Sequence, residues 1–334
     1  MKKLLASTLF VAAACVGVGS ASAQESCGKL TIADMNWASA QVLAQVDKMI
    51  LEKGYGCEAE IVPGDTMPTF ASMTEKGEPD VAPEMWVNQF RDQIDAAVKE
   101  GRIVYGAASL SDGGVEGWWV PTYFAKEHPE IKTIKDALAH PELFPASEDP
   151  SKGAVHNCPS GWGCQITTAN FYKAYDGDSK GFTLVDTGSG AGLDSSIAKA
   201  YEDKKAWLGY YWAPTPILGK YDMTRLGFDT TFDEAEWKRC TSVADCTDPK
   251  VNAWTKTEVF TMLTPKVAEQ SSGAAEYFKT RAWDNATVNK LLAWKEENQD
   301  PNGQDTAEHF LKTQPEVWSK WVSPEIAEKV KAGL

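Results

Sequence analysis

Beyond residue 29, short apolar runs alternate with stretches in which apolar side chains recur every three or four residues. The run from Leu30 to Ala33 is typical of a buried strand, and the recurrence from Val42 to Ile50 predicts a helix. Ser39 is placed to cap that helix. The same succession continues with predicted strands at 58–63, 81–86 and 103–105 and predicted helices at 67–73 and 89–99.

The pattern changes at residues 114–121, a predicted strand bracketed by glycines and ended by Pro121. We interpret it as the crossing into a second lobe, from which the chain returns at 222–226. This lobe is predicted to hold strands at 182–186 and 206–212 and helices at 134–139, 167–175 and 193–201. Beyond it the pattern predicts helices at 265–269, 274–281, 286–299 and 306–312.

This alternation predicts an α/β protein with parallel sheets, whose ligands lie beyond the carboxyl ends of the strands. About 310 residues remain without the leader described below, more than one core comfortably holds. We therefore expect two lobes, the first formed by 24–113 and 223–334 and the second by 114–222, with the ligand in the cleft between them.

The amino terminus has the form of a secretory signal. Lys2 and Lys3 precede a short apolar run, and Ala21-Ser22-Ala23 is a small-x-small cleavage site, so residues 1–23 are predicted to be removed on export to the periplasm. A lipoprotein acylated at Cys15 is the alternative, although Ala12 stands where a branched aliphatic residue is preferred. No other apolar stretch approaches the roughly 20 residues of a spanning helix.

Six cysteines remain once Cys15 has left with the signal, and an even number in an exported chain favours disulfides. Six cysteines allow fifteen sets of pairs. Proximity in sequence favours Cys158–Cys164 and Cys240–Cys246, which leaves Cys27–Cys57. Zinc is a poor alternative because the four histidines form no ligand-spaced cluster with these cysteines.

The formal charge of −14 becomes more negative when the two lysines of the leader are removed. Nucleic acid and anionic lipid both require a basic face, so neither is an expected partner. The composition is unusual instead in its thirteen tryptophans.

Four tryptophans lie at predicted strand ends or in glycine-rich loops, two in each lobe: Trp37, Trp86, Trp162 and Trp207. A tryptophan considered alone is more often a core residue. Four indole faces brought together by lobe closure, however, suit a trimethylammonium group, which donates no hydrogen bonds and is attracted by aromatic faces. The tryptophans on or beside the late helices are predicted to pack in the core: Trp237, Trp254, Trp283, Trp294, Trp318 and Trp321.

Glu116, just before the Trp118-Trp119 pair, is the candidate for offsetting the charge of a cationic ligand or sharing a proton with a polar oxygen on it. On a solvated strand edge it would be an ordinary surface acid. Asp34 and Asp65 are weaker candidates that suit helix caps better. The candidates for the rim of the site are Asn36, Trp118, Tyr210 and Trp212. Strand alternation prevents the consecutive residues Tyr210, Tyr211 and Trp212 from all pointing inward.

Enzyme templates fit poorly, and we expect no catalytic residue and no cofactor. The glycine-rich segment 188–192 lacks a P-loop lysine, and Ser189 is not in a nucleophile elbow. A secreted hydrolase or lyase acting on a small amine would need a histidine or a metal among the tryptophan loops. Asp245 and Asp248 are weak candidates for a structural calcium site, since the alternating acids of a dedicated loop are missing.

Five segments together resemble the substrate-binding proteins of glycine betaine/proline-type ABC importers. They are Asn36-Trp37, DVAPEMW at 80–86, GWWVP at 117–121, CPSGWGC at 158–164 and YYWAPTP at 210–216. The resemblance implies a two-lobed periplasmic binding protein of type II, a monomer that closes an aromatic cage on a quaternary ammonium compound. It also implies docking on a membrane permease served by an ATPase.

Within that family, four tryptophans and a glutamate before the Trp pair look most similar to the trimethylamine N-oxide binders. A facing Glu116 would repel the carboxylate of glycine betaine but would tolerate an N-oxide or choline. Backbone N–H groups at Asn36-Trp37-Ala38, near a helix start, are a remaining receptor for a carboxylate. The expected order of ligands is trimethylamine N-oxide, then glycine betaine, with choline or carnitine as the alternative.

Overall fold

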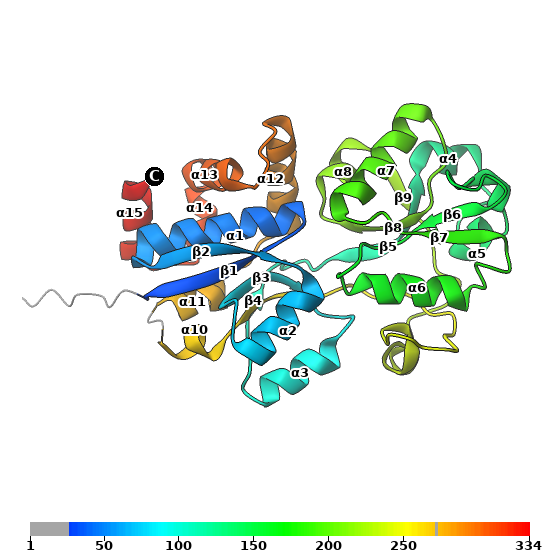
Figure 1. The fold of residues 1–334 in the computed structure, drawn as a ribbon. Helices are drawn as coiled ribbons and strands as arrows, with labels where there is room; N and C mark the ends of the chain where they lie inside the picture. Colours follow the sequence, from blue (N-terminus) through cyan, green and yellow to red (C-terminus); the bar gives the residue numbers. More distant parts are fainter. Residues whose placement is uncertain (1–26, 271–272) are drawn as a thin grey trace, which may run out of the picture.

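The protein folds into two lobes that lie side by side (Figure 1), and the chain crosses between them twice, outward near Gly114 and back near Thr257. A computed structural model describes residues 27–270 and 273–334, so the predicted signal peptide at 1–23 lies outside the described residues. Each lobe is built on one five-stranded sheet. The predicted two-lobed α/β architecture is confirmed.

The first lobe has the strand order β2-β1-β3-β10-β4. Its strands are β1 (Lys29–Met35), β2 (Glu58–Gly64), β3 (Val81–Trp86), β4 (Val104–Ala108) and β10 (Val259–Leu263). Its helices are α1 (Ala38–Ile50), α2 (Thr66–Lys76), α3 (Arg91–Lys99), α10 (Pro265–Gln270), α11 (Ala274–Thr280), α12 (Asn285–Glu297), α13 (Gln304–Thr313), α14 (Pro315–Trp318) and α15 (Pro324–Gly333). Strand β1 is parallel to β2 and β3 as predicted, whereas β10 is antiparallel between β3 and β4.

The second lobe has the order β7-β6-β8-β5-β9. Its strands are β5 (Val115–Pro121), β6 (Gly153–His156), β7 (Phe182–Val185), β8 (Gly209–Ala213) and β9 (Met223–Arg225). Its helices are α4 (Thr122–Glu127), α5 (Ile134–Ala137), α6 (Cys164–Ala174), α7 (Gly190–Asp203) and α8 (Pro216–Lys220). Strand β5 pairs antiparallel with both β8 and β9, so this sheet is mixed and not purely parallel.

The predicted return to the first lobe near residue 223 is wrong, because β9 pairs with β5 and adds an edge to the second sheet. The following segment, with α9 (Glu234–Glu236) and a π-helical turn at Trp237–Thr241, also stays with the second lobe. Asn170 on α6 holds it by donating hydrogen bonds to the carbonyls of Cys240 and Thr241. The chain returns at Thr257, whose backbone pairs with Gly114 at the outgoing crossing.

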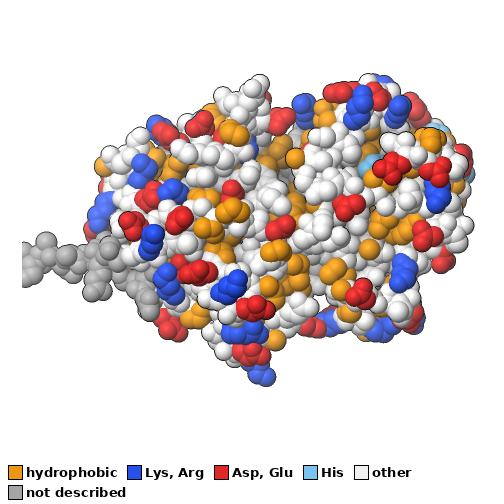
Figure 2. Space-filling model, in the orientation of Figure 1, with side chains coloured by type: hydrophobic (Ala, Val, Ile, Leu, Met, Phe, Trp, Pro, Cys, Tyr) orange, Lys and Arg blue, Asp and Glu red, His pale blue; other side chains and the backbone are white. Residues whose placement is uncertain are grey.

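The two disulfides favoured by proximity in sequence, Cys158–Cys164 and Cys240–Cys246, and the remaining pair Cys27–Cys57 are those of the structure. Five of the six late tryptophans expected to pack are buried, and the sixth, Trp294, stacks on His309. Acidic and basic side chains are interspersed over the face shown in Figure 2. Within the described ranges, no helix is both long enough and apolar enough to cross a bilayer.

Candidate ligand-binding site

A small cavity lies between the lobes and takes its walls from both. We call its lining the cage, which consists of Trp37, Thr66, Trp86, Gln89, Glu116, Trp162, Gly163, Cys164, Tyr210 and Trp212. Four of these residues belong to the first lobe and the others to the second. The cage therefore exists in this form only when the two lobes are together.

The first lobe contributes two indoles from the ends of neighbouring parallel strands. Trp37 follows β1 directly and precedes α1, and Trp86 is the last residue of β3. Both indole Nε1 atoms donate to one oxygen of Glu84, at 2.8 Å and 2.9 Å, and the Ser39 hydroxyl donates to the same oxygen at 2.9 Å. Ser39 is thus a partner of Glu84 and not the predicted helix cap. Sequence reasoning missed Glu84, whose signal was an acid inside an otherwise apolar central strand.

At Gly114, where the chain crosses between the lobes, the backbone packs directly against the ring of Trp86. A Cβ atom added at Gly114 would come within 2.0 Å of the Trp86 ring, so any side chain there would displace the indole. Glycine at this position lets the chain pass directly over the ring as it leaves the first lobe.

The second lobe presents Trp162 on the loop closed by the Cys158–Cys164 disulfide. Its indole Nε1 donates to Asn36 Oδ1 across the lobes at 2.7 Å, and its ring meets Trp37 edge to face at 5.2 Å. The carbonyl of Gly161 also accepts a cross-lobe hydrogen bond from the Met67 amide. These contacts join the loop directly to the first-lobe half of the cage.

The glycines beside Trp162 have a role that the sequence did not indicate. Gly161 has a φ of +89°, and an added Cβ would lie 2.5 Å from the Asp65 carboxylate. At Gly163 a Cβ would lie 3.1 Å from the Cβ of Gln89. The absence of side chains therefore allows close approach of the two lobes, as well as leaving the indole uncrowded.

Strand β8 supplies Tyr210 and Trp212, whose rings stack at 6.2 Å, and Trp212 meets Trp162 edge to face at 5.0 Å. Tyr211 points the other way, with its hydroxyl 2.5 Å from Asp194. This is the alternation expected of a strand.

Glu116 faces the cage from β5 and is 1% exposed. Its carboxylate accepts hydrogen bonds from Gln89 Nε2 on both oxygens, at 2.8 Å each, from Tyr210 at 2.9 Å and from Thr257. Burial raises the pKa of Glu116, and the three donors oppose that rise. Because every partner donates, the arrangement suits the ionised carboxylate. Among the described residues that line the cage there is no lysine, arginine or histidine.

Two predicted aromatic residues do not reach the cage. Trp207 was expected at a strand end beside the cage, but β8 begins only at Gly209, so Trp207 precedes the amino end of that strand. Its ring stacks on His156 at 5.1 Å and its Nε1 donates to Ser196 at 2.9 Å. Trp118 is completely buried within the second lobe. Trp212, predicted only as a rim residue, occupies the fourth indole position instead.

The other predicted polar residues lie outside the cage lining. Asn36 is the cross-lobe acceptor of Trp162, and Asp65 caps α2 by accepting the Thr66 amide. Asp34 also stands outside the lining, and burial raises its pKa.

Asp245 and Asp248, the weak candidates for a calcium site, do not together form a group of metal ligands in the described part of the chain. Asp248 accepts a hydrogen bond from Arg239, at 3.1 Å. The neighbouring sulfurs of Cys240 and Cys246 are joined in a disulfide and are not thiolates. Asp245 is outside the one group of potential metal ligands found within the described residues.

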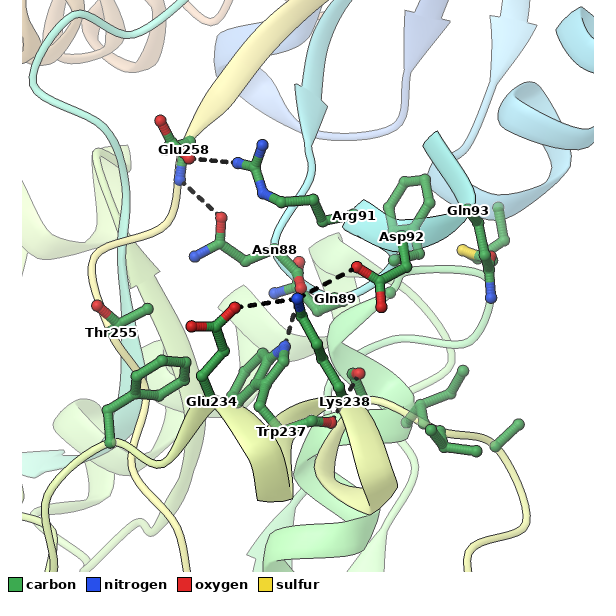
Figure 3. Close-up of a pocket in the computed structure, with 18 of the residues that line it drawn as sticks. Asn88, Gln89, Arg91, Asp92, Gln93, Glu234, Trp237, Lys238, Thr255 and Glu258 are labelled. Atoms are coloured by element: carbon green, nitrogen blue, oxygen red, sulfur yellow. Dashed lines mark hydrogen bonds and ion pairs between the residues drawn. The ribbon is translucent and has the colours of Figure 1, made fainter. Parts of the chain in front are cut away.

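A second cavity of about 700 Å³ adjoins the cage, between α3 and the segment 234–243 (Figure 3). Gln89 and Gly163 line both cavities and so lie at their boundary. Across it, Trp237 Nε1 donates to the carbonyl of Asn88 at 2.9 Å, and Lys238 lies 3.6 Å from Asp92. These contacts join the lobes a second time.

Comparison with known proteins places this geometry in context. The model of a family described as the substrate-binding domain of ABC-type glycine betaine transport systems matches residues 28–313. A glycine betaine/L-proline-binding protein (ProX) from Borrelia burgdorferi is similar with a TM-score of 0.71 and 18% identity, over 90% of this chain and 99% of that one. A choline-binding protein of an ABC transporter, solved with choline, has a TM-score of 0.72 and 18% identity, over 92% and 98%. Lactococcal OpuAC, closed on glycine betaine, has a TM-score of 0.67 and 17% identity, over 89% and 100%.

Proposed function

The chain belongs to the family of substrate-binding domains of ABC-type glycine betaine transport systems, and on this basis we propose that its cage captures a small trimethylammonium compound for import. Trimethylamine N-oxide is the first candidate ligand and glycine betaine the second, with choline or carnitine as the alternative. As a substrate-binding protein it is not an enzyme, so the alternative of a secreted hydrolase or lyase is set aside.

The aromatic lining supports a cationic ligand. Trp37, Trp86, Trp162 and Trp212 surround the cavity, and all four are at least nine-tenths buried. Each aromatic face that meets a desolvated cation contributes about 0.5–2 kcal/mol. Several faces together are sufficient for micromolar binding after the costs of ordering and association.

The observation that carries the choice among ligands is the buried carboxylate of Glu116 in a lining without a basic side chain. A carboxylate ligand such as glycine betaine would meet an anion and no positive partner, which is unfavourable in a dry site. A trimethylammonium group without a carboxylate meets a countercharge. This favours trimethylamine N-oxide and choline over glycine betaine and carnitine.

The small size of the cavity and the hydrogen-bond donors beside it favour trimethylamine N-oxide over choline. The unfilled space in the cage is about 20 Å³, close to what one water molecule requires, so the smallest ligand needs the least widening. An N-oxide oxygen is a strong acceptor and needs donors. Gln89 and Tyr210 stand beside the cavity, and either can supply a donor by turning an N–H or O–H from Glu116 to the N-oxide.

The test is to titrate the mature protein with trimethylamine N-oxide, glycine betaine and choline, following heat release and indole fluorescence. We expect the N-oxide to bind most tightly and glycine betaine to bind less well. Failure of all three to bind to a protein that melts cooperatively would refute the proposal. Tightest binding of glycine betaine would refute the role assigned to Glu116.

The wider setting follows from the same proposal. Family members are extracellular or periplasmic, and we propose that this chain is exported to the periplasm after cleavage at Ala23 and works as a monomer with a permease and its ATPase. The three disulfides support an oxidising compartment. Amino-terminal sequencing of the exported protein tests the cleavage site.

A further inference from the structure

Glu84 is a buried carboxylate behind the cage that does not line it. Its side chain is fully buried, and one of its oxygens accepts from Trp37, Trp86 and Ser39 at 2.8–2.9 Å. Its other oxygen has no hydrogen-bond partner among the described residues. A buried acid is costly to keep in an apolar strand, so its position behind two ligand-facing indoles requires a reason.

The first consequence of this arrangement is orientation. Each indole has one N–H, and binding both to a single atom restricts the rotation of both rings. Glu84, Trp37 and Trp86 all belong to the first lobe, so these two bonds persist whether or not the lobes are together. The bond from Trp162 to Asn36 differs, because it joins the two lobes and must break when they separate.

The second consequence is electrostatic. The fully buried guanidinium of Arg281 donates to Asp47 at 2.8 Å and to the carbonyl of Pro83 at 3.3 Å, next to Glu84 in sequence. Burial raises the pKa of Glu84, while its three donors and the charge of Arg281 lower it. An N–H donated to an anion makes a stronger, more polarised hydrogen bond. An indole polarised in this way carries more electron density on its face, which strengthens its attraction for a cation.

We propose that Glu84 is a positioning and specificity-determining residue, which holds Trp37 and Trp86 in place before the lobes close and makes their faces select for a cation. The proposal rests on the cage being the ligand site. Its selectivity component requires the charge of Glu84, and its positioning component requires only the acceptor atom. Two substitutions separate these components.

Glu84→Gln keeps the size and the acceptor oxygen but removes the charge. The probes are choline and its uncharged isostere 3,3-dimethylbutan-1-ol, titrated into the full mature chain. We expect choline affinity to fall roughly fivefold to tenfold, as weakened cation–π contacts at two rings imply, while affinity for the alcohol changes less than about twofold. Equal losses for the two probes, or no loss for either, would overturn the selectivity component.

Glu84→Met removes the acceptor as well as the charge, so affinity for the alcohol should now fall too, and choline affinity should fall further than it does in Glu84→Gln. Asp80→Asn is the matched control. Asp80 is a buried carboxylate that lies just before the same strand, binds Thr31 and Lys266, and does not line the cage. This substitution should leave both affinities unchanged. A loss in Asp80→Asn equal to that in Glu84→Gln would show that any buried acid in this lobe has the effect, and would overturn the proposal.

Hydrogen exchange at the indole N–H groups tests the positioning component in the unsubstituted protein, and it needs neither a ligand nor a folded variant. Without ligand, the N–H groups of Trp37 and Trp86 should exchange at least about tenfold more slowly than that of Trp162, whose partner lies in the other lobe. Equal rates would overturn pre-positioning by Glu84. If none of the candidate cations bound to the wild-type protein, the proposed function would fail, yet this exchange result would still stand.

Discussion

Substitution of Trp162 most clearly tests whether a buried tryptophan binds the ligand or only stabilises the core. Replacing Trp162 with alanine removes one indole face, two edge-to-face ring contacts, with Trp37 and Trp212, and the hydrogen bond to Asn36. A cation–π face is worth about 0.5–2 kcal/mol, an aromatic pair about 0.5–1.5 kcal/mol and a hydrogen bond about 1 kcal/mol. Because part of this energy is recovered by water and by ring relaxation, we expect a net loss of about 2–3 kcal/mol, or roughly 30- to 150-fold in Kd.

The same substitution should change the stability of the isolated lobes little. Most of the contacts of Trp162 cross to the first lobe or face the cavity, and its loop is closed by a disulfide. The matched control is Trp207→Phe. That residue is buried in the second lobe against His156 and Ser196, so its replacement should lower the melting temperature by several degrees and leave Kd within about twofold.

Calorimetric titration with the tightest-binding candidate gives Kd, and differential scanning calorimetry of the ligand-free proteins gives the melting temperature. The reasoning is refuted if Trp162→Ala unfolds the protein or leaves Kd unchanged. It is also refuted if Trp207→Phe weakens binding as strongly as Trp162→Ala does, because that would restore Trp207 to the cage.

Three further predictions concern the carboxylate, the cross-lobe bond and the loop. Burial raises the pKa of Glu116, so choline affinity should fall as the pH is lowered through that raised pKa and the countercharge is lost. In calorimetric titrations Glu116→Gln should bind choline weakly, and its affinity should depend less on pH than that of the wild-type protein. A steep profile in Glu116→Gln would assign the titration to another group. Asn36→Ala removes the acceptor of Trp162 and should weaken binding about fivefold with an unchanged melting temperature, whereas tighter binding would mean that the bond opposes closure. The double substitution Cys158→Ser and Cys164→Ser opens the loop and should lower affinity several-fold, because the loop then loses more entropy on binding. Calorimetry should show this as a more unfavourable binding entropy. Unchanged affinity would contradict the role of the disulfide in ordering the loop before binding.

Two-lobed organisation and half of the cage could be predicted from local pattern. Trp37 and Trp86 follow directly from apolar strands, and parallel strands end at one edge of a sheet, so their proximity was accessible without coordinates. The disulfides were equally accessible, because two pairs are only six residues apart. Glu116 was identified by its place before the Trp pair, although its three donors come from residues between 27 and 141 positions away.

The errors concern strand pairing between distant segments. The apolar run at 206–212 does not show where β8 begins. The strand begins at Gly209 because that residue pairs with Trp119 and His156 on neighbouring strands. That start decides that Trp212, and not Trp207, reaches the cavity. The lobe boundary was misplaced for the same reason, since β9 has three residues and becomes a strand through its contact with β5.

The sequence by itself therefore determined the elements that local periodicity encodes, the strand-end tryptophans Trp37 and Trp86, the disulfide-closed loop of Trp162 and the carboxylate at Glu116. Only the tertiary structure decided which aromatic residue completes the cage and which polar groups hold it. Trp162 meets Asn36 across 126 positions, and Glu84 holds Trp37 across 47. Such bonds depend on the packing of whole lobes, because a hydrogen bond requires two groups within about 3 Å and no local pattern specifies the distance between remote segments.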